Sequence, residues 1–208
     1  MSDVHPVIER LVLGSFQTNC YLVLCPDTHA ALIIDPADDP DRILRTAELK
    51  EARIEQILLT HAHPDHIAGL PALRQSTGAT VLAHRLEAQT LGLYLRFFGL
   101  PAEQLPLLRP NVQLDGGEEI AVGRLRGTVI HTPGHSPGSI TLKMGSHLFT
   151  GDTLFARGVG RVDLPGGNLE SLVESLGLIL TQPDESIVYP GHGPSSTVGK
   201  ERRQNPYV

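Results

Sequence analysis

The chain has 208 residues, of which 40% are hydrophobic, and a formal net charge of −6 from 17 basic and 23 acidic residues. This length suits one well-filled hydrophobic core, so we expect a single domain over residues 1–208. Nucleic-acid binders usually carry a strongly basic face, because neutralising phosphates supplies most of their affinity. The compact basic run KERR at 200–203 stands alone in this acidic chain, which argues against a nucleic-acid partner.

No apolar run is long enough to cross a bilayer, and the N-terminal MSDVHPVIER lacks the basic-then-apolar pattern of a secretory signal. We therefore expect a cytoplasmic protein without a membrane partner, either a monomer or a small homo-oligomer. Cys20 and Cys25 are separated by four residues, which fits neither a redox CxxC pair nor a zinc knuckle. Buried free thiols are expected instead.

The predicted elements alternate between strands and helices. In the first half they are strands at 7–13, 20–24 and 31–34, a helix at 40–52, a strand at 54–59, a helix at 67–77, a strand at 80–83 and a helix at 86–98. Residues 100–110 hold three prolines and predict a surface connection. Beyond Val112 strands return at 119–122, 125–130, 139–143 and 147–149, before a helix at 169–180 and a last strand at 187–189. This order predicts two stacked sheets with helices on their outer faces.

The stretch ILLTHAHPDHIAGL at 57–70 places three histidines and an aspartate at the end of an apolar strand. Such groups cost several kcal/mol each if they are buried without a partner. In extended backbone His61 and His63 point the same way, and Pro64 then breaks the extension before Asp65 and His66. Because this spacing does not form one face of a helix, it predicts a loop that presents ligands to a metal ion.

Three later strand ends lead into loops of the same kind. The loops HTPGHSPGS at 131–139, TGDTLF at 150–155 and PGHGP at 190–194 each combine a glycine with one candidate ligand, which are His135, Asp152 and His192. Five histidines and two aspartates exceed the needs of one tetrahedral ion. The set favours two ions bridged by a carboxylate and a water-derived hydroxide, which is the arrangement of metal-assisted hydrolysis.

We therefore expect two divalent metal ions in each chain. Nitrogen and oxygen ligands suit zinc, which is the first expectation, and also iron or manganese. Other residues of similar chemistry have simpler interpretations: His84 and His131 are expected to be structural. The aromatic residues Tyr94, Phe97 and Phe98 are expected to pack on one helix face, with a place at the mouth of the pocket as the alternative.

The segments THAHPDH, HTPGHSPGS, TGDTLF and YPGHGP, in this order and at these separations, resemble the metallo-beta-lactamase superfamily over almost the whole chain. The segment LFARGVGRVDLPGG at 154–167 is most similar to the small metallo-hydrolases related to glyoxalase II. The resemblance implies an α/β fold, a four-layer αββα sandwich of two mixed β-sheets with helices on the outer faces.

The resemblance also implies a ligand set, in which one ion lies at His61, His63 and His135, a second lies at Asp65, His66 and His192, and Asp152 bridges them. Asp65 and Asp152 are the carboxylates assigned to catalysis. In this family a metal-bridging hydroxide attacks a thioester carbonyl, so the expected partner is a small-molecule thioester such as S-lactoylglutathione. Arg161 falls where the family places a basic residue near glutathione, so it is expected to bind substrate.

The sequence departs from glyoxalase II in two places. The stretch after His192 is shorter than the helical extension with which those enzymes hold glutathione, and Asp163 stands where many members have a tyrosine. A smaller or different thioester is therefore an open alternative.

Two rival functions share the fold. A persulfide dioxygenase would use one non-haem iron at His63, His135 and Asp152, and the R-x-D pattern at 161–163 fits that group too. A nuclease of the superfamily ranks lower, because no basic face is visible.

Overall fold

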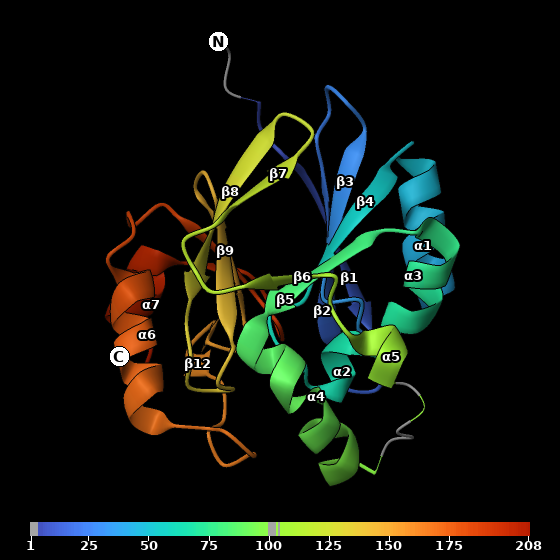
Figure 1. Cartoon of the computed structure of the whole chain (residues 1–208). Helices are drawn as coiled ribbons and strands as arrows, with labels where there is room; N and C mark the ends of the chain where they lie inside the picture. The colour runs from blue at the N-terminus through green and yellow to red at the C-terminus, as the bar shows by residue number, and fades with distance from the viewer. Residues whose placement is uncertain (1–3, 100–102, 104) are drawn as a thin grey trace.

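The structure is a computed structural model that describes residues 4–99, 103 and 105–208. Its strands form two six-stranded sheets and a separate two-stranded hairpin. Helices cover the outer face of each sheet, as Figure 1 shows for α1 and α3 beside one sheet and α6 and α7 beside the other. The predicted αββα sandwich is confirmed.

The first sheet contains, in spatial order, β1 (Val7–Leu13), β2 (Thr18–Leu24), β3 (Ala30–Ile34), β4 (Arg53–Leu58), β5 (Thr80–His84) and β6 (Val112–Leu114). The helices of this half are α1 (Pro40–Leu49), α2 (Pro64–Ile67), α3 (Leu70–Thr77), α4 (Arg85–Phe97) and α5 (Leu105–Leu108). Strands β1, β2 and β3 pair antiparallel, whereas β3 to β6 pair parallel, so the sheet is mixed.

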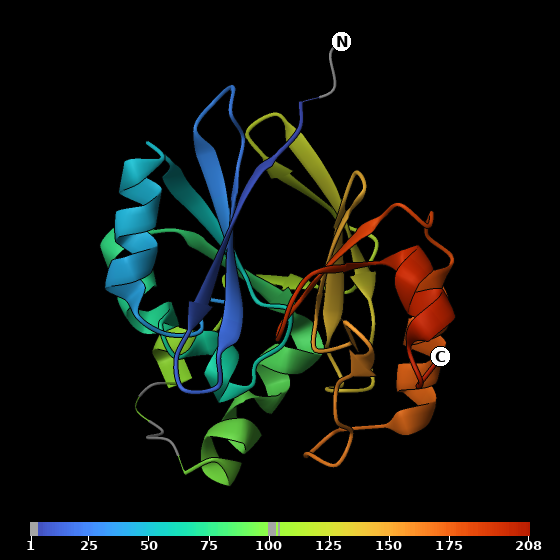
Figure 2. The same cartoon turned by 180° about the vertical axis from the view of Figure 1, so that it is seen from behind.

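The second sheet contains, in spatial order, β14 (Ser196–Thr197), β13 (Ile187–Pro190), β10 (His147–Gly151), β9 (Ile140–Met144), β8 (Leu125–His131) and β7 (Glu119–Val122). The hairpin is β11 (Leu154–Phe155) with β12 (Gly158–Val159), and the helices are α6 (Leu169–Leu180) and α7 (Val198–Gln204). Figure 2 shows the two sheets facing each other from behind, with the helices outside.

Successive side chains of each strand point to opposite faces of the sheet, and this alternation divides the hydrophobic core into layers. Cys20 and Leu22 of β2 pack toward the helices of the first half, while Tyr21 and Val23 pack between the two sheets against residues such as Phe149. This is the two-residue period of a strand that is buried on both faces. Both cysteines are buried free thiols, as predicted.

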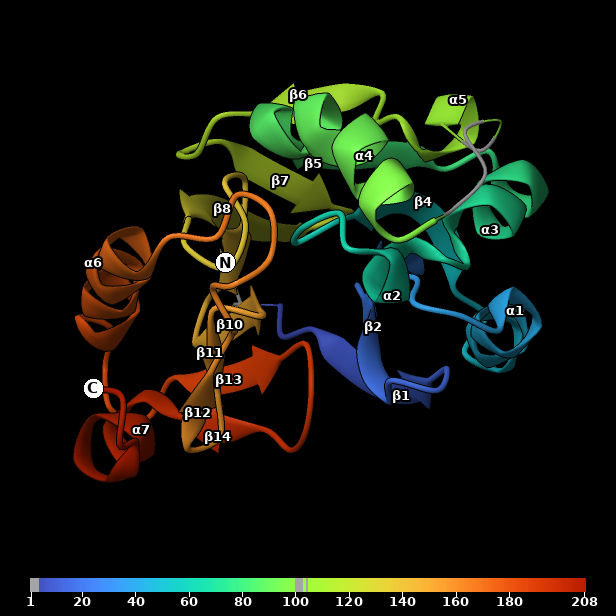
Figure 3. The ribbon, with the colours of Figure 1, turned by 90° about the horizontal axis from the view of Figure 1, so that it is seen from below.

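The strand directions bring the loops of the second sheet to one end of the sandwich. Strands β8 and β10 both run antiparallel to β9, and β13 runs parallel to β10, so these three strands end at the same edge. The loop after β4 joins them there, because the backbone N–H of Ile140 donates to the carbonyl of Thr60 at 2.9 Å. Figure 3 looks at the sandwich from below and shows α2, β11 and β12 near this end.

Some predicted boundaries are wrong. The predicted helix 67–77 begins only at Leu70, as α3, while Ile67 ends the separate helix α2. The break falls at Gly69, whose N–H donates to the carbonyl of Pro36 at 2.9 Å instead of to a carbonyl of α2. The predicted connection at 100–110 contains α5; residues 100–102 and 104 lie outside the described residues. The strand β13 does not close the fold, because β14 and α7 follow it. Among the described residues, no helix combines the length and the apolar character that a bilayer crossing needs.

We expect Ile57→Ala to lower the free energy of unfolding by about 2–5 kcal/mol, because the fully buried Ile57 side chain would leave a cavity beneath the helices. Leu49, at the exposed end of α1, is the matched control, and its change to alanine should alter stability by less than about 0.5 kcal/mol. Urea unfolding at fixed metal content measures both. Equal losses in the two variants would contradict the assigned core.

Candidate metal centre

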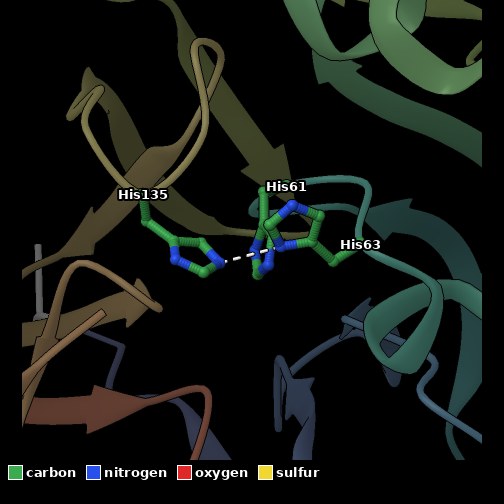
Figure 4. Close-up of side chains that lie close together, drawn as sticks. All are labelled: His61, His63 and His135. Atoms are coloured by element: carbon green, nitrogen blue, oxygen red, sulfur yellow. Dashed lines mark hydrogen bonds between the residues drawn. The ribbon is translucent and has the colours of Figure 1, made fainter. Parts of the chain in front are cut away.

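Two loops supply the first ligand group, which consists of His61, His63 and His135. Their ring nitrogens lie within 4.8 Å of one another, and all three side chains are buried. His63 Nδ1 is 2.8 Å from His135 Nε2. Figure 4 shows the three rings turned toward one another, His61 and His63 from the loop after β4 and His135 from the loop after β8. Three imidazole nitrogens that converge in this way can hold one metal ion.

The second ligand group consists of Asp65, His66 and His192, whose candidate ligand atoms also lie within 4.8 Å of one another. Asp65 and His66 lie in the short helix α2, after Pro64 has broken the extended loop. His192 Nε2 is 3.3 Å from Asp65 Oδ2, which brings the end of β13 onto α2. This group offers two nitrogens and a carboxylate.

Asp152 lies between the two groups. Its Oδ1 is 3.4 Å from His66 Nε2, and its Oδ2 is 3.6 Å from His135 Nε2 and 3.5 Å from His192 Nε2. One carboxylate therefore reaches a member of each group, as a bridging ligand must. All seven residues predicted as ligands come together; which ion each of them binds stays a prediction.

Unpaired polar atoms show that these residues fit metal ions. The Nε2 atoms of His61 and His66 and Oδ1 of Asp152 are buried without a hydrogen-bond partner among the described residues. Each such atom costs about 1–3 kcal/mol unless a ligand contacts it. Imidazole nitrogens and carboxylate oxygens are ligands for zinc, iron and manganese. The clusters are consistent with a site for two metal ions.

The two ligand groups differ in electrostatics. Burial lowers the pKa of His61 well below its usual range and that of His63 to about 3, so both rings are neutral and keep a lone pair for a metal. Burial also opposes a charge on His66, but the carboxylates of Asp152 and Asp35 outweigh it and raise its pKa well above the usual value. The field in the second group therefore favours a positive charge.

Asp35, directly after β3, orients His66. Its Oδ1 accepts the Thr60 N–H at 2.7 Å, and its Oδ2 accepts the Thr60 hydroxyl at 2.6 Å and lies 2.9 Å from His66 Nδ1. This carboxylate can hold a proton on Nδ1 and so keep Nε2 free to bind a metal. The sequence predicts only a strand end at Asp35-Pro36, and no local pattern indicates this contact.

Glu87 joins the two loops of the first ligand group. The fully buried carboxylate accepts the Ala62 N–H at 2.8 Å on Oε2, and the Ser136 hydroxyl at 2.7 Å and the Gly138 N–H at 2.8 Å on Oε1. Ala62 lies between two ligands, and Ser136 follows a third. Glu87 was not predicted; the signal that could have found it is an acid among the apolar positions of the predicted helix 86–98.

Backbone carbonyls orient two further ligands. His135 Nδ1 lies 2.7 Å from the carbonyl oxygen of Arg161, and His192 Nδ1 lies 3.2 Å from that of Phe16. Each carbonyl can accept the ring N–H and leave Nε2 for a metal ion. The Thr18 hydroxyl donates to Asp65 Oδ2 at 3.1 Å and fixes that carboxylate in the same way.

A cavity of about 430 Å³ opens over both ligand groups. Ligand side chains form part of its lining, and the remaining lining residues are Phe16, Pro64, Phe98, Phe155, Val159, Arg161 and Leu164. The Arg161 side chain forms two hydrogen bonds with Asp163, at 2.6 and 2.7 Å. Arg161 thus lies at the cavity as predicted, while its binding of substrate stays a prediction.

Predictions for the remaining histidines and aromatic residues are partly confirmed. His84 and His131 stack with ring centroids 4.1 Å apart, and within the described part of the chain neither belongs to a ligand group. Tyr94 is buried, as predicted. Phe97 and Phe98 are 56% and 40% exposed, so the prediction that they pack on the helix face is wrong. Phe98 lines the cavity, which confirms the alternative prediction for this residue.

Comparison with known proteins identifies the family. The profile of the metallo-beta-lactamase superfamily matches residues 13–192. The hydroxyacylglutathione hydrolase GloC of Haemophilus influenzae is 32% identical, over 97% of this chain and 97% of its own. The chain belongs to the metallo-beta-lactamase superfamily, and its histidine and aspartate clusters are those of a metallo-hydrolase.

Two solved structures are similar over most of their length. ETHE1 from Myxococcus xanthus is 34% identical, with a TM-score of 0.83, over 96% of this chain and 83% of its own. TTHA1623, solved in a di-iron-bound form, is 35% identical, with a TM-score of 0.81, over 96% of this chain and 100% of its own. A similar protein therefore holds two metal ions on this fold.

We expect Glu87→Gln to lower the free energy of unfolding by about 1–3 kcal/mol, because the amide NH₂ would face a backbone N–H that now donates to a carboxylate oxygen. Glu48→Gln on the exposed side of α1 is the control and should change stability by less than about 0.5 kcal/mol. Urea unfolding in the presence of a chelator measures both variants without a metal contribution. Unchanged stability of Glu87→Gln would refute the role assigned to Glu87.

Proposed function

We propose that the protein hydrolyses small-molecule thioesters with two divalent metal ions. The observation that carries this proposal is the position of Asp152, whose two carboxylate oxygens reach both ligand groups. The similarity to a hydroxyacylglutathione hydrolase over nearly the full length supports a thioester as substrate. Zinc is the first candidate metal, with iron and manganese as alternatives.

Each ligand group would hold one metal ion. His61, His63 and His135 would hold one ion, and the second ligand group would hold the other. When bound, the pair supplies a hydroxide at neutral pH and polarises the substrate carbonyl. Asp152 fixes the position of one ligand group relative to the other, because its carboxylate reaches both. Burial favours the neutral form of Asp65, but the hydrogen bond to His192 and the charge of His66 outweigh it and lower the pKa.

An ionised Asp65 at the cavity floor can therefore bind a metal ion. The apolar side chains around the cavity limit the access of water, which strengthens electrostatic interactions at the floor. The thiolate product leaves through the cavity mouth, where Arg161 and Asp163 together carry no net charge.

A persulfide dioxygenase with one iron is the second candidate, because the similarity to ETHE1 is as high as that to the hydrolase. Its three ligands, His63, His135 and Asp152, are neighbours here: the two histidine nitrogens are 2.8 Å apart and Asp152 Oδ2 is 3.6 Å from His135 Nε2. One iron per chain, with oxygen consumption on glutathione persulfide, would favour this candidate over the hydrolase.

The test combines metal analysis with turnover of S-lactoylglutathione. We expect two metal ions per chain and release of free thiol, because each ligand group brings three candidate ligand atoms within 4.8 Å of one another. Asp152→Ala should lose about one metal ion and at least about 100-fold in kcat/KM, because it removes the carboxylate shared by both groups. Asp41→Ala, in the exposed first turn of α1, is the control and should retain both properties. An Asp152→Ala enzyme with full metal content and activity would refute the bridging role.

A further inference from the structure

We propose that the cavity selects thioesters whose thiol part is apolar and uncharged, in preference to glutathione thioesters. This preference presupposes the thioester hydrolysis proposed above and specifies its substrate class. It follows from the side chains that surround the two ligand groups and from the charges that the cavity offers.

Aromatic rings stand beside both ligand groups. The ring centroid of Phe98, after the end of α4, is 5.9 Å from that of His63, and the ring centroid of Phe155, in β11, is 6.0 Å from that of His192. Phe16, in the loop between β1 and β2, lines the same cavity. A substrate held over both groups therefore contacts phenyl rings contributed by three separate segments.

Two of these rings are exposed in the free protein, and Phe155 is partly exposed. Phe16 is 71% exposed and Phe98 is 40% exposed, although both lie at a cavity whose floor is polar. Removing apolar surface from water is favourable in proportion to its area, so a ligand gains most affinity by placing an apolar group against the rings. Val159 and Leu164 add aliphatic surface to the lining. The cavity therefore favours thioesters whose thiol part is a hydrocarbon.

The charges of the cavity do not match glutathione, which carries two carboxylates and an ammonium group. Among the described lining residues, Arg161 is the one cationic side chain other than histidine, and Asp163 binds it through two hydrogen bonds. An ammonium group would find only Asp65 and Asp152, which belong to the metal site. Charged groups of glutathione that enter the cavity lose their hydration and find no opposite charge to compensate for it. This loss lowers the affinity for glutathione thioesters.

The direct test compares S-benzyl thioacetate with S-acetylglutathione in the enzyme loaded with two metals. Both substrates have the same acetyl group and an alkanethiol leaving group, so they differ mainly in what the cavity contacts. We expect kcat/KM for the benzyl ester to be at least about tenfold higher, chiefly through a lower KM, since one buried phenyl group supplies that factor.

Variants identify the cause of the preference. Phe98→Ala should reduce kcat/KM for the benzyl ester about tenfold, which is at least about threefold more than its effect on S-acetylglutathione. Tyr207→Ala removes a ring that is 64% exposed and does not line the cavity, so it should leave both values unchanged. Asp163→Asn frees Arg161 for a substrate carboxylate and should raise kcat/KM for S-acetylglutathione about threefold or more. Metal content is measured for every variant.

A binding measurement complements the kinetics. In 4-phenylbutan-2-one a CH₂ group replaces the sulfur of S-benzyl thioacetate, so the compound cannot be hydrolysed. Calorimetry on metal-free protein should show that it binds at least about threefold more tightly than S-methylglutathione, and that Phe98→Ala removes the difference. Equal affinities for the two ligands in the unsubstituted protein would overturn the preference.

The kinetic outcomes separate this preference from the reaction itself. If the two-metal enzyme hydrolyses S-acetylglutathione as well as the benzyl ester or better, the preference is overturned and thioester hydrolysis stands. If neither thioester is hydrolysed by the two-metal enzyme, the proposed function is overturned together with the preference.

Discussion

Buried imidazole rings that face one another are the constraint on which the rest of the structure depends. His61, His63, His66 and His135 are each at most 3% exposed and meet at one edge of the two sheets. Neutral rings with unused lone pairs are costly in such a place, and charged rings would repel one another. Cations that accept several lone pairs at once remove both problems. The same residues therefore cost stability without metal and form the chemical centre of the molecule.

The close packing of the ligand side chains restricts which residues the neighbouring backbone can carry. A Cβ atom at Gly191 would overlap the carboxylate of Asp152 and the ring of His66, so only glycine fits at this position. At Gly134, next to His135, the backbone has φ +139° and a Cβ would overlap the backbone of Leu172 in α6. The glycines of the ligand loops therefore permit close packing on both sides of the ligands.

The sequence indicated the fold and the ligands because both leave local patterns. Apolar segments that end in histidine loops can be seen one at a time, and the edge where they meet follows from the strand order. Asp35 and Glu87 could not be assigned, because each contacts residues about 25 or more positions away and no spacing records such contacts. The sequence left two places open for Phe98, because an aromatic residue at the end of a helix shows the same pattern whether it packs in a core or lines a cavity.

Short elements were missed for a related reason. The strands β11, β12 and β14 have two residues each, too few to show a period, and α2 spans a single turn. Their positions are set by tertiary contacts. In α7 the buried carboxylate of Glu201 accepts the Arg157 N–H at 2.6 Å, which joins the last helix to the hairpin that carries Phe155.

Arg161 serves the site with two separate parts of one residue. Its carbonyl oxygen, which every amino acid possesses, contacts the ring of His135, whereas its guanidinium extends away to Asp163 at the surface. Replacement of the side chain therefore leaves the ligand anchored. Substitution at this position can therefore change the charge beside the cavity while the ring of His135 keeps its contact with the backbone.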